Sequence, residues 1–296
     1  MPLRADFDSL VPARDFSRRD FVRAALGSGF AAAVLPVRAD AIRTDHAGLV
    51  TGEVTIPSGG FPMPAYRAMP EGRGDLPVVL VVSEVFGVHD YIADVARRFA
   101  KAGYLAVAPE LFARQGDPQS YGELARLLAE VVGRTPDAEV MSDLDACVEW
   151  ARAQGGDVRR LAITGFCWGG RIVWLYDAHT GRAARTPLKA AVAWYGRLVD
   201  TPTPLQPTSA IEVAGALAAP VLGLYGGADP GIPVEHVARM RSALAHGSAA
   251  ARASEIVVYA EAPHAFHADY RPSYRAEAAQ DGWRRALAWL RAHGAA

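Results

Sequence analysis

The sequence contains little cysteine, almost no lysine and no long apolar run after its first forty residues. Two cysteines in 296 residues exclude a disulfide scaffold and a four-thiolate zinc site. No stretch of about 18 or more apolar residues follows residue 40, so we do not expect that part of the chain to span a membrane. Lysine and arginine together number 31 against 32 aspartates and glutamates. This balance gives no field that would attract nucleic acid.

The apolar share of 51% is ample for a large interior and excludes a disordered or collagen-like chain. The chain is about twice the commonest domain size, yet α/β folds of about 200–250 residues often form around one core. No internal repeat or low-complexity tract interrupts it. We therefore expect one folded α/β domain.

The first forty residues have the pattern of an export signal. Residues 17–23 read Ser-Arg-Arg-Asp-Phe-Val-Arg, a twin-arginine pattern, and a short stretch rich in Ala and Gly follows, with small residues at Ala39 and Ala41. This order is typical of a secretory signal and is too short for a membrane span. We expect residues 1–39 to be a twin-arginine signal peptide for periplasmic or secreted delivery, and residues 40–296 to be the domain. The alternative is an amphipathic helix with an incidental arginine pair.

Short β-branched runs bounded by Pro or Gly alternate with helical patterns along the rest of the chain. Several runs are apolar on both faces, as a covered parallel sheet requires, whereas the first two alternate and favour an antiparallel edge. The pattern predicts a doubly wound, mostly parallel sheet with helices on both faces. The expected strands are residues 52–56, 65–69, 78–82, 105–108, 161–164, 190–194, 221–224 and 255–259, and the expected helices are about residues 90–102, 120–133, 138–154, 169–178, 235–245 and 274–292.

One expected strand runs into a glycine-rich turn that contains a cysteine. Residues 165–170 read Gly-Phe-Cys-Trp-Gly-Gly, which matches the nucleophile elbow of α/β-hydrolases with cysteine in place of serine. The glycines permit a tight turn and close packing of strand and helix. At the start of a helix, the dipole and the free N–H groups favour a thiolate at Cys167. The alternative is a buried, inert cysteine beside a turn.

Two later strand ends supply an acid and a base. Asp229 follows the strand at residues 221–224, and His264 follows the strand at residues 255–259. Each alone is an ordinary loop residue. Together with Cys167 they follow the order nucleophile, acid, base that α/β-hydrolases show.

Glu84 follows the strand at residues 78–82, in an otherwise apolar setting. A carboxylate there needs a partner or takes a raised pKa. The alternative is a helix cap or an exposed loop charge.

Five motifs together resemble the dienelactone hydrolase (carboxymethylenebutenolidase) family of the α/β-hydrolase superfamily. They span about residues 50–293, and the elbow resembles that of exported members. The resemblance implies that Cys167 is the nucleophile, His264 the base and Asp229 its orienting acid. It also implies that Glu84 pairs with the resting thiol and takes its proton, and that the N–H groups of Val85 and Trp168 form the oxyanion hole. The motifs are Ser-Glu-Val-Phe-Gly-Val at 83–88, Pro-Glu-Leu-Phe-Ala-Arg at 109–114, the elbow at 165–170, Gly-Ala-Asp at 227–229 and Pro-His-Ala-Phe at 263–266.

The chain departs from the family where the substrate carboxylate is held. Well-known members have an arginine four residues after the histidine, and this position is Ala268. Arg271 is the nearest candidate to replace it. Phe86 and Tyr195 are the aromatic candidates for the substrate pocket, although either could belong to the core.

The expected activity is hydrolysis of an ester or a lactone through a thioester acyl-enzyme. It needs no cofactor, and histidines such as His89, His236 and His246 show no metal-ligand spacing. The expected partners are a small-molecule substrate and, for the precursor, the twin-arginine export machinery. The alternatives are a thioesterase or general carboxylesterase, and a non-catalytic thiol sensor. We expect no disulfide to Cys147, which falls on the apolar face of its helix.

Overall fold

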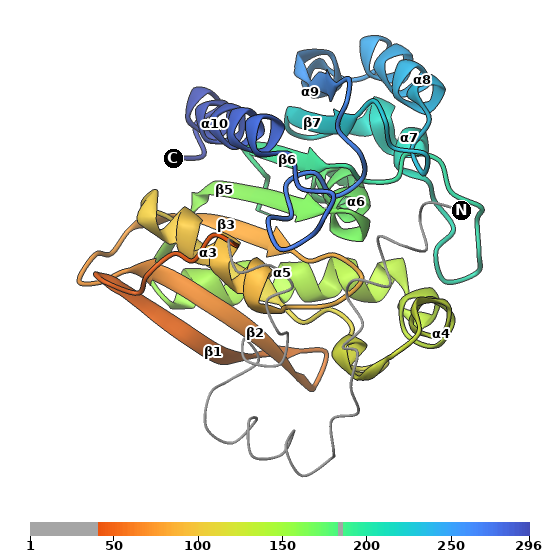
Figure 1. Ribbon diagram of the computed structural model, residues 1–296. Helices are drawn as coiled ribbons and strands as arrows, with labels where there is room; N and C mark the ends of the chain where they lie inside the picture. Colours follow the sequence, from red (N-terminus) through yellow and green to blue (C-terminus); the bar gives the residue numbers. More distant parts are fainter. Residues whose placement is uncertain (1–40, 183–185) are drawn as a thin grey trace.

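A computed structural model describes residues 41–182 and 186–296. The expected signal peptide at residues 1–39 lies outside the described residues. The described residues form one eight-stranded sheet with helices packed on both of its faces (Figure 1). None of the described helices is long and apolar enough to cross a membrane.

The sheet confirms the expected strands and their directions. Strands β1 and β2 pair antiparallel, and β2 pairs antiparallel with β4, while all other neighbours are parallel. The early hairpin is therefore the antiparallel edge that its alternating pattern predicts. The strands are β1 (Leu49–Ser58), β2 (Phe61–Pro70), β3 (Leu76–Val82), β4 (Leu105–Pro109), β5 (Gly156–Phe166), β6 (Ala190–Trp194), β7 (Val221–Gly226) and β8 (Glu255–Tyr259), in the order β1-β2-β4-β3-β5-β6-β7-β8.

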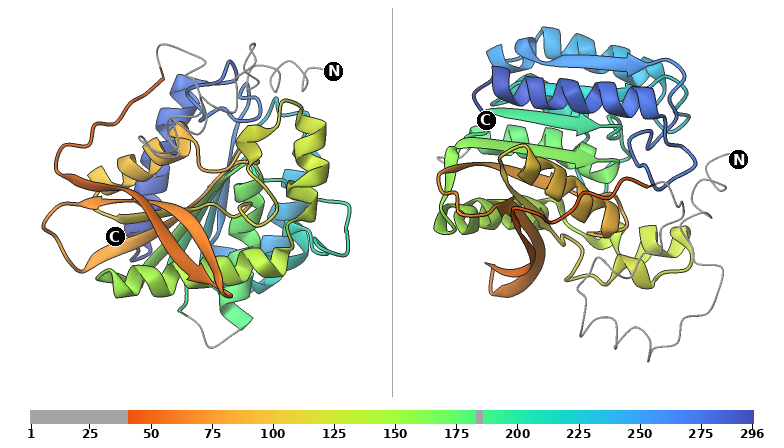
Figure 2. Two further views of the ribbon diagram at one scale, coloured as in Figure 1. Left: turned by 90° about the horizontal axis from the view of Figure 1, so that it is seen from below. Right: turned by 60° about the vertical axis from the view of Figure 1, so that its left-hand side comes forward.

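The helices lie on two faces of the sheet. Helices α3 and α10 cover one face, and α5, α6 and α8 cover the other (Figures 1 and 2). Five of the six expected helices are present close to their predicted bounds. The expected helix at residues 120–133 is shortened to α4, with a separate 3₁₀ turn before and after it, and the two short helices α7 and α9 were not expected. The helices are α3 (Asp90–Lys101), α4 (Leu124–Glu130), α5 (Asp137–Ala153), α6 (Trp168–Arg182), α7 (Ala210–Val213), α8 (Val234–Ala245), α9 (Ala249–Ala253) and α10 (Ala276–Ala292).

The burial of each element follows its hydrophobic pattern. Every residue of β3 is buried, because this central strand has a helix layer on each side. In α10, Ala286 and Leu290 are fully buried, whereas Arg284 and Arg285 are exposed and pair with Asp281. The helix therefore presents one apolar stripe to the sheet. Cys147 is fully buried in α5 and is a free thiol, which confirms its core position.

The backbone pairing continues one step beyond the strand ends and so places the loops that follow. The N–H of Cys167 donates to the carbonyl of Trp194 at 3.0 Å, and the N–H of Tyr195 donates to the carbonyl of Leu224 at 2.8 Å. Each bond fixes a residue just past the carboxyl end of a parallel strand. Ligand sites in sheets of this kind lie at that edge.

Glycines allow α6 to touch the sheet backbone. A methyl group on Gly170 would lie 2.5 Å from the carbonyl oxygen of Trp194 and 2.8 Å from the Cα of Gly196. On Gly169 it would lie 2.6 Å from the carbonyl oxygen of Ser83. Both obstacles are backbone atoms, so no side-chain rotation can relieve the contact.

Gly170→Ala is therefore expected to destabilise the protein by about 1–3 kcal/mol. The usual effect of this exchange inside a helix is the opposite, since alanine is the better helix former. The free energy of unfolding in urea measures the change. Gly122→Ala is the matched control, because a methyl group there meets nothing within 4 Å. Equal stability of the two variants would contradict the close contact.

Candidate active site

Cys167 occupies the sharp turn between β5 and α6. Its φ is 55°, a left-handed conformation that costs a non-glycine residue about 1–3 kcal/mol. Two other non-glycine residues with positive φ stand at this edge, Tyr195 at 37° and Ala265 at 57°. Backbone strain of this kind persists where the surrounding structure enforces it and is typical of functional sites. The Cys167 side chain is half-buried and free of any disulfide.

His264 and Asp229 form a hydrogen-bonded pair next to this thiol. The Nδ1 atom of His264 lies 2.7 Å from Oδ2 of Asp229. The other oxygen of Asp229 accepts the N–H of Gly231 at 2.8 Å. Asp229 is 4% exposed, so its orientation is fixed by these two contacts. The imidazole is thereby held with Nε2 as the nitrogen available for chemistry.

The electrostatics connect the histidine to the cysteine. Burial disfavours the charged imidazole, but the negative charge of a Cys167 thiolate and hydrogen bonds with Asp229 and Cys167 outweigh it, and the pKa of His264 rises to about 10. The structure thus brings together the three residues that the sequence order singled out.

Glu84 is fully buried and bound on one oxygen. Its Oε2 lies 2.9 Å from Nε2 of His89 and accepts the Tyr270 hydroxyl at 3.0 Å. Burial raises the pKa of this carboxyl, but the hydrogen bond and charge of His89, the charge of Arg271 and the Tyr270 hydroxyl outweigh it and lower the pKa below its ordinary value. From the sequence we expected the Glu84 carboxyl to have either a partner or a raised pKa. In the structure it has partners.

Arg271 lies inside the site. Its side chain is 2% exposed, and Nη1 lies 3.9 Å from Oε1 of Glu84. Burial lowers the pKa of this guanidinium, but the charges of Tyr270, Glu84, Cys167 and Tyr195 outweigh it and raise the pKa. A buried cation, Arg271, therefore lies near the candidate nucleophile Cys167. From the sequence alone, Arg271 was only a candidate for this place.

Of the other candidate residues, Tyr195 contacts His264, while Val85 and Phe86 follow Glu84 in the chain and Trp168 follows Cys167. The Tyr195 ring packs edge-on against His264, with centroids 5.2 Å apart, but its side chain is fully buried. Phe86 is half-buried. Among the described residues, the N–H groups of Val85 and Trp168 donate to no backbone carbonyl. Both remain available to bind an oxyanion.

Comparisons with known proteins identify the family. The model of the Dienelactone hydrolase family matches residues 63–294. The chain belongs to the dienelactone hydrolase family. It is 54% identical over 294 residues to a candidate carboxymethylenebutenolidase of Methylorubrum extorquens, covering 99% of this chain and 98% of the relative.

Two further relatives place the chain within the family. A candidate dienelactone hydrolase from Klebsiella pneumoniae has a crystal structure that superposes with a TM-score of 0.78 at 54% identity, covering 82% of this chain and 98% of that one. A candidate 2-oxo-3-(5-oxofuran-2-ylidene)propanoate lactonase of a Bradyrhizobium species is 34% identical, covering 81% of this chain and 93% of the relative. The fold is thus that of the α/β-hydrolases, and the chain is a hydrolase of the dienelactone hydrolase type, consistent with a carboxylic ester hydrolase.

Glu110 binds the backbone of the segment that follows Glu84, and the sequence analysis gave it no role. Its Oε2 accepts the N–H of Val88 at 2.7 Å. Gly87 has a φ of +73°, and a methyl group there would lie 2.5 Å from the same carboxyl oxygen. Burial raises the pKa of Glu110 to about 7. The only signal in the sequence was a charged residue directly after a buried strand.

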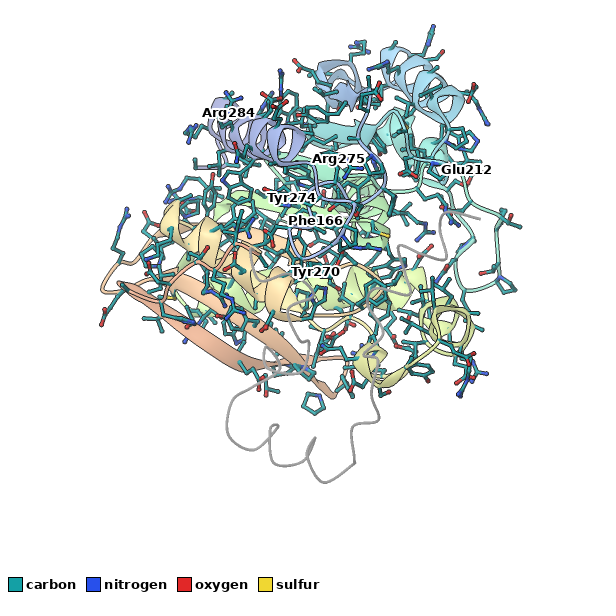
Figure 3. All side chains as sticks on the ribbon, viewed as in Figure 1. Phe166, Glu212, Tyr270, Tyr274, Arg275 and Arg284 are labelled. Atoms are coloured by element: carbon teal, nitrogen blue, oxygen red, sulfur yellow. The ribbon has the colours of Figure 1, made fainter. Side chains whose placement is uncertain are left out.

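Sequence reasoning also missed how the loop between β8 and α10 is fastened. This loop carries Tyr270 and Tyr274 (Figure 3). The Tyr91 hydroxyl lies 2.6 Å from Nδ1 of His267, and Arg98 contacts Asp269 at 2.5 Å. Both contacts tie the loop to α3, more than 170 residues earlier in the chain.

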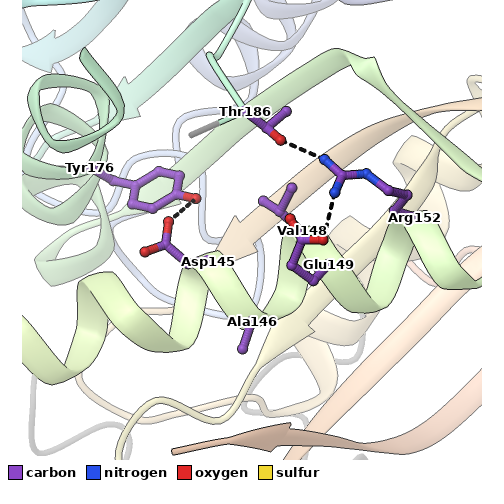
Figure 4. Close-up of a pocket in the computed structure, with 7 residues that line it drawn as sticks. All are labelled: Asp145, Ala146, Val148, Glu149, Arg152, Tyr176 and Thr186. Carbon is purple, nitrogen blue, oxygen red and sulfur yellow. Dashed lines mark hydrogen bonds and ion pairs between the residues drawn. The ribbon is translucent and has the colours of Figure 1, made fainter. Parts of the chain in front are cut away.

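A separate surface hollow of about 500 Å³ lies between α5 and α6. Its polar groups pair with one another, since Tyr176 bonds Asp145 while Arg152 bonds Glu149 and Thr186 (Figure 4). It contains none of the candidate residues. Among the described residues, no group of three or more His, Cys, Asp and Glu side chains is arranged to hold a metal ion.

Replacing Cys167 by alanine is expected to lower the pKa of His264 from about 10, because the thiolate supplies both a charge and a hydrogen bond. Because the folded-state pKa of His264 is raised, protonation of this histidine stabilises the folded protein. This contribution to the free energy of unfolding is complete below the unfolded-state pKa near 6.5 and is lost as the pH rises through about 10. NMR titration of the histidine rings measures the pKa, and His264→Asn assigns the signal. An unchanged pKa in Cys167→Ala would contradict the pairing.

Proposed function

We propose that the protein hydrolyses an ester or a lactone through covalent catalysis by Cys167. The main support for the proposal is the environment of His264. Asp229 binds its Nδ1 atom, and the cysteine beside it keeps the imidazole protonated. A thiolate and an imidazolium at the start of a helix form an activated nucleophile.

The reaction proceeds in two steps, acylation of Cys167 and hydrolysis of the thioester. The Cys167 thiolate attacks the substrate carbonyl carbon, a C–S bond forms, the C–O bond breaks, and the leaving alkoxide takes the proton from His264. Water then attacks the thioester while His264 takes a proton from it, and the thiolate leaves as the acid product forms. With a lactone the alkoxide stays attached to the acyl group.

The oxyanion of each tetrahedral intermediate binds the N–H groups of Val85 and Trp168. Their lack of backbone acceptors in the described residues supports this role. One such donor contributes about 2.7–4 kcal/mol in a well-studied protease. The strained turn at Cys167 and the fixed loop after Glu84 keep the two donors in place.

The thiol proton is assigned to His264 rather than to Glu84. The pKa of His264 is raised to about 10, whereas that of Glu84 is lowered by its donors, so the imidazole is the stronger base. The role of Glu84 as proton acceptor stays a prediction from the resemblance. Its surroundings favour a permanent anion.

The substrate is proposed to carry a carboxylate that Arg271 attracts. The buried guanidinium near Cys167 supports this, and the Bradyrhizobium relative is named for a lactone of an oxo acid. Phe86 lines the apolar side of the substrate, and Tyr195 contributes ring packing beside His264. No cofactor enters the proposed chemistry.

Cys167→Ala is expected to reduce kcat/KM for an activated ester by about 1,000-fold or more, since loss of a nucleophile removes the covalent route. Intact mass spectrometry of the native enzyme should show an acyl adduct that the variant lacks. Cys147→Ala, which changes the other and fully buried cysteine, is the control. Full esterase activity of Cys167→Ala would refute the mechanism.

A panel of substrates distinguishes the related activities. Esters and lactones with and without a free carboxylate, together with thioesters, are compared by kcat/KM. A preference for carboxylate-bearing lactones supports the proposal, and a preference for thioesters or neutral esters supports a thioesterase or a general carboxylesterase. Ready oxidation of Cys167 without any hydrolysis would support a thiol sensor.

We further propose export through the twin-arginine machinery, supported by the pattern at residues 17–23. Replacing both Arg18 and Arg19 by lysine is expected to leave the protein in the cytoplasm of a bacterial host. Fractionation and the N-terminal sequence of the exported protein measure this. A periplasmic protein that begins at Met1 would contradict it.

A further inference from the structure

The buried carboxylate of Glu84 has two unlike oxygens. Oε2 receives two donors, Nε2–H of His89 and the hydroxyl of Tyr270. Oε1 is buried and has no hydrogen-bond partner among the described residues, and it is the oxygen 3.9 Å from Arg271. The donors therefore set which oxygen faces the arginine.

The His89 side chain makes this polar contact and no other that the structure describes. It is the N-cap residue of α3, yet its side chain makes no capping hydrogen bond. The side chain is 2% exposed, and its ring packs against the rings of Tyr91 and Tyr270, with centroids 6.0 and 5.1 Å away. Its Nδ1 is buried without a partner, so Nε2 must carry the proton donated to Glu84.

Glu84 depends on these donors for its charge. A carboxylate removed from water is expensive unless it is paired and hydrogen-bonded. Removing one donor from a buried charged pair leaves part of that cost uncompensated. The titratable or charged groups that face Glu84 come from several elements: His89, Tyr91, Tyr195, Tyr270 and Arg271.

We propose that His89 is a positioning residue that holds Glu84 as an anion, with Oε1 turned toward Arg271 beside Cys167. His89 acts on the substrate only through the pair formed by Glu84 and Arg271. The inference rests on the proposed function for its catalytic consequence, since Arg271 is the proposed anchor of the substrate carboxylate. The structural part stands without it.

Without the His89 donor, burial dominates and Glu84 takes up a proton in the acidic range. The negative charge that lies 3.9 Å from Arg271 is then lost, and the net charge near Cys167 becomes more positive. The variant should therefore differ from the native protein at low pH and approach it as the pH rises.

The test is the alkylation of Cys167 by neutral iodoacetamide and by anionic iodoacetate across the pH range. Both reagents need the same thiolate, so the ratio of their rates cancels the titration of Cys167 itself. In His89→Leu, the iodoacetate-to-iodoacetamide ratio is expected to rise several-fold as the pH falls, while it stays flat in the native protein. The kcat/KM for a carboxylate-bearing ester, divided by that for a neutral ester, is expected to rise in the same direction at the acidic end, because the same positive charge attracts both anions.

Three further variants separate positioning from folding. His89→Gln keeps an N–H donor at the position of Nε2 and should restore the native ratio. Tyr270→Phe removes the other donor to the same oxygen and should change the ratio in the same direction as His89→Leu. His179→Leu breaks a similar histidine–carboxylate contact, 3.0 Å from Asp145, outside the site and should change nothing.

The outcomes are distinct. A flat ratio in both His89→Leu and Tyr270→Phe would overturn the proposal, as would a His89→Gln protein that behaves like His89→Leu. If no variant and no native protein hydrolyses any substrate while the ratio still responds, the proposed function fails and the role of His89 stands.

Discussion

The backbone contact between α6 and the sheet determines where the chemistry can occur. Gly170 lies so close to the carbonyl of Trp194 that no side chain fits between them. The same carbonyl receives the N–H of Cys167. Cys167, in its left-handed conformation, lies between this hydrogen bond and the start of α6. Trp168, the first residue of α6, directly follows Cys167, and His264 interacts with the thiol.

Charge balance in a nearly dry space is the second constraint. Glu84 and Arg271 are almost fully buried, and a single buried ion would be prohibitive. Together with His89 and Tyr270 they form a set in which each charge has partners. Cys167 and His264 form a second pair beside them. The site thus places a buried guanidinium near Cys167, with which His264 also interacts.

The sequence was sufficient for the fold and for the order of Cys167, Asp229 and His264, because both depend on local patterns. Apolar runs identify strands, and each of these residues directly follows one. His89, Glu110 and Tyr270 could not be assigned in this way. Tyr270 reaches Glu84 across 186 positions, and Glu110 acts through the backbone of Val88. Such pairings depend on the packing of side chains between elements, which periodicity does not describe.

The segment that follows the expected signal peptide takes part in the same architecture. The N–H of Thr44 donates to Asp94 at 2.6 Å, and Asp94 also pairs with Arg98. Arg98 in turn holds Asp269, on the loop that carries Tyr270 and Arg271. Residues near the start of the described chain are thus linked through α3 to the loop that completes the site. A mature chain beginning after residue 39 keeps this connection, whereas one shortened beyond Thr44 would leave Asp94 with fewer donors and the loop less firmly held.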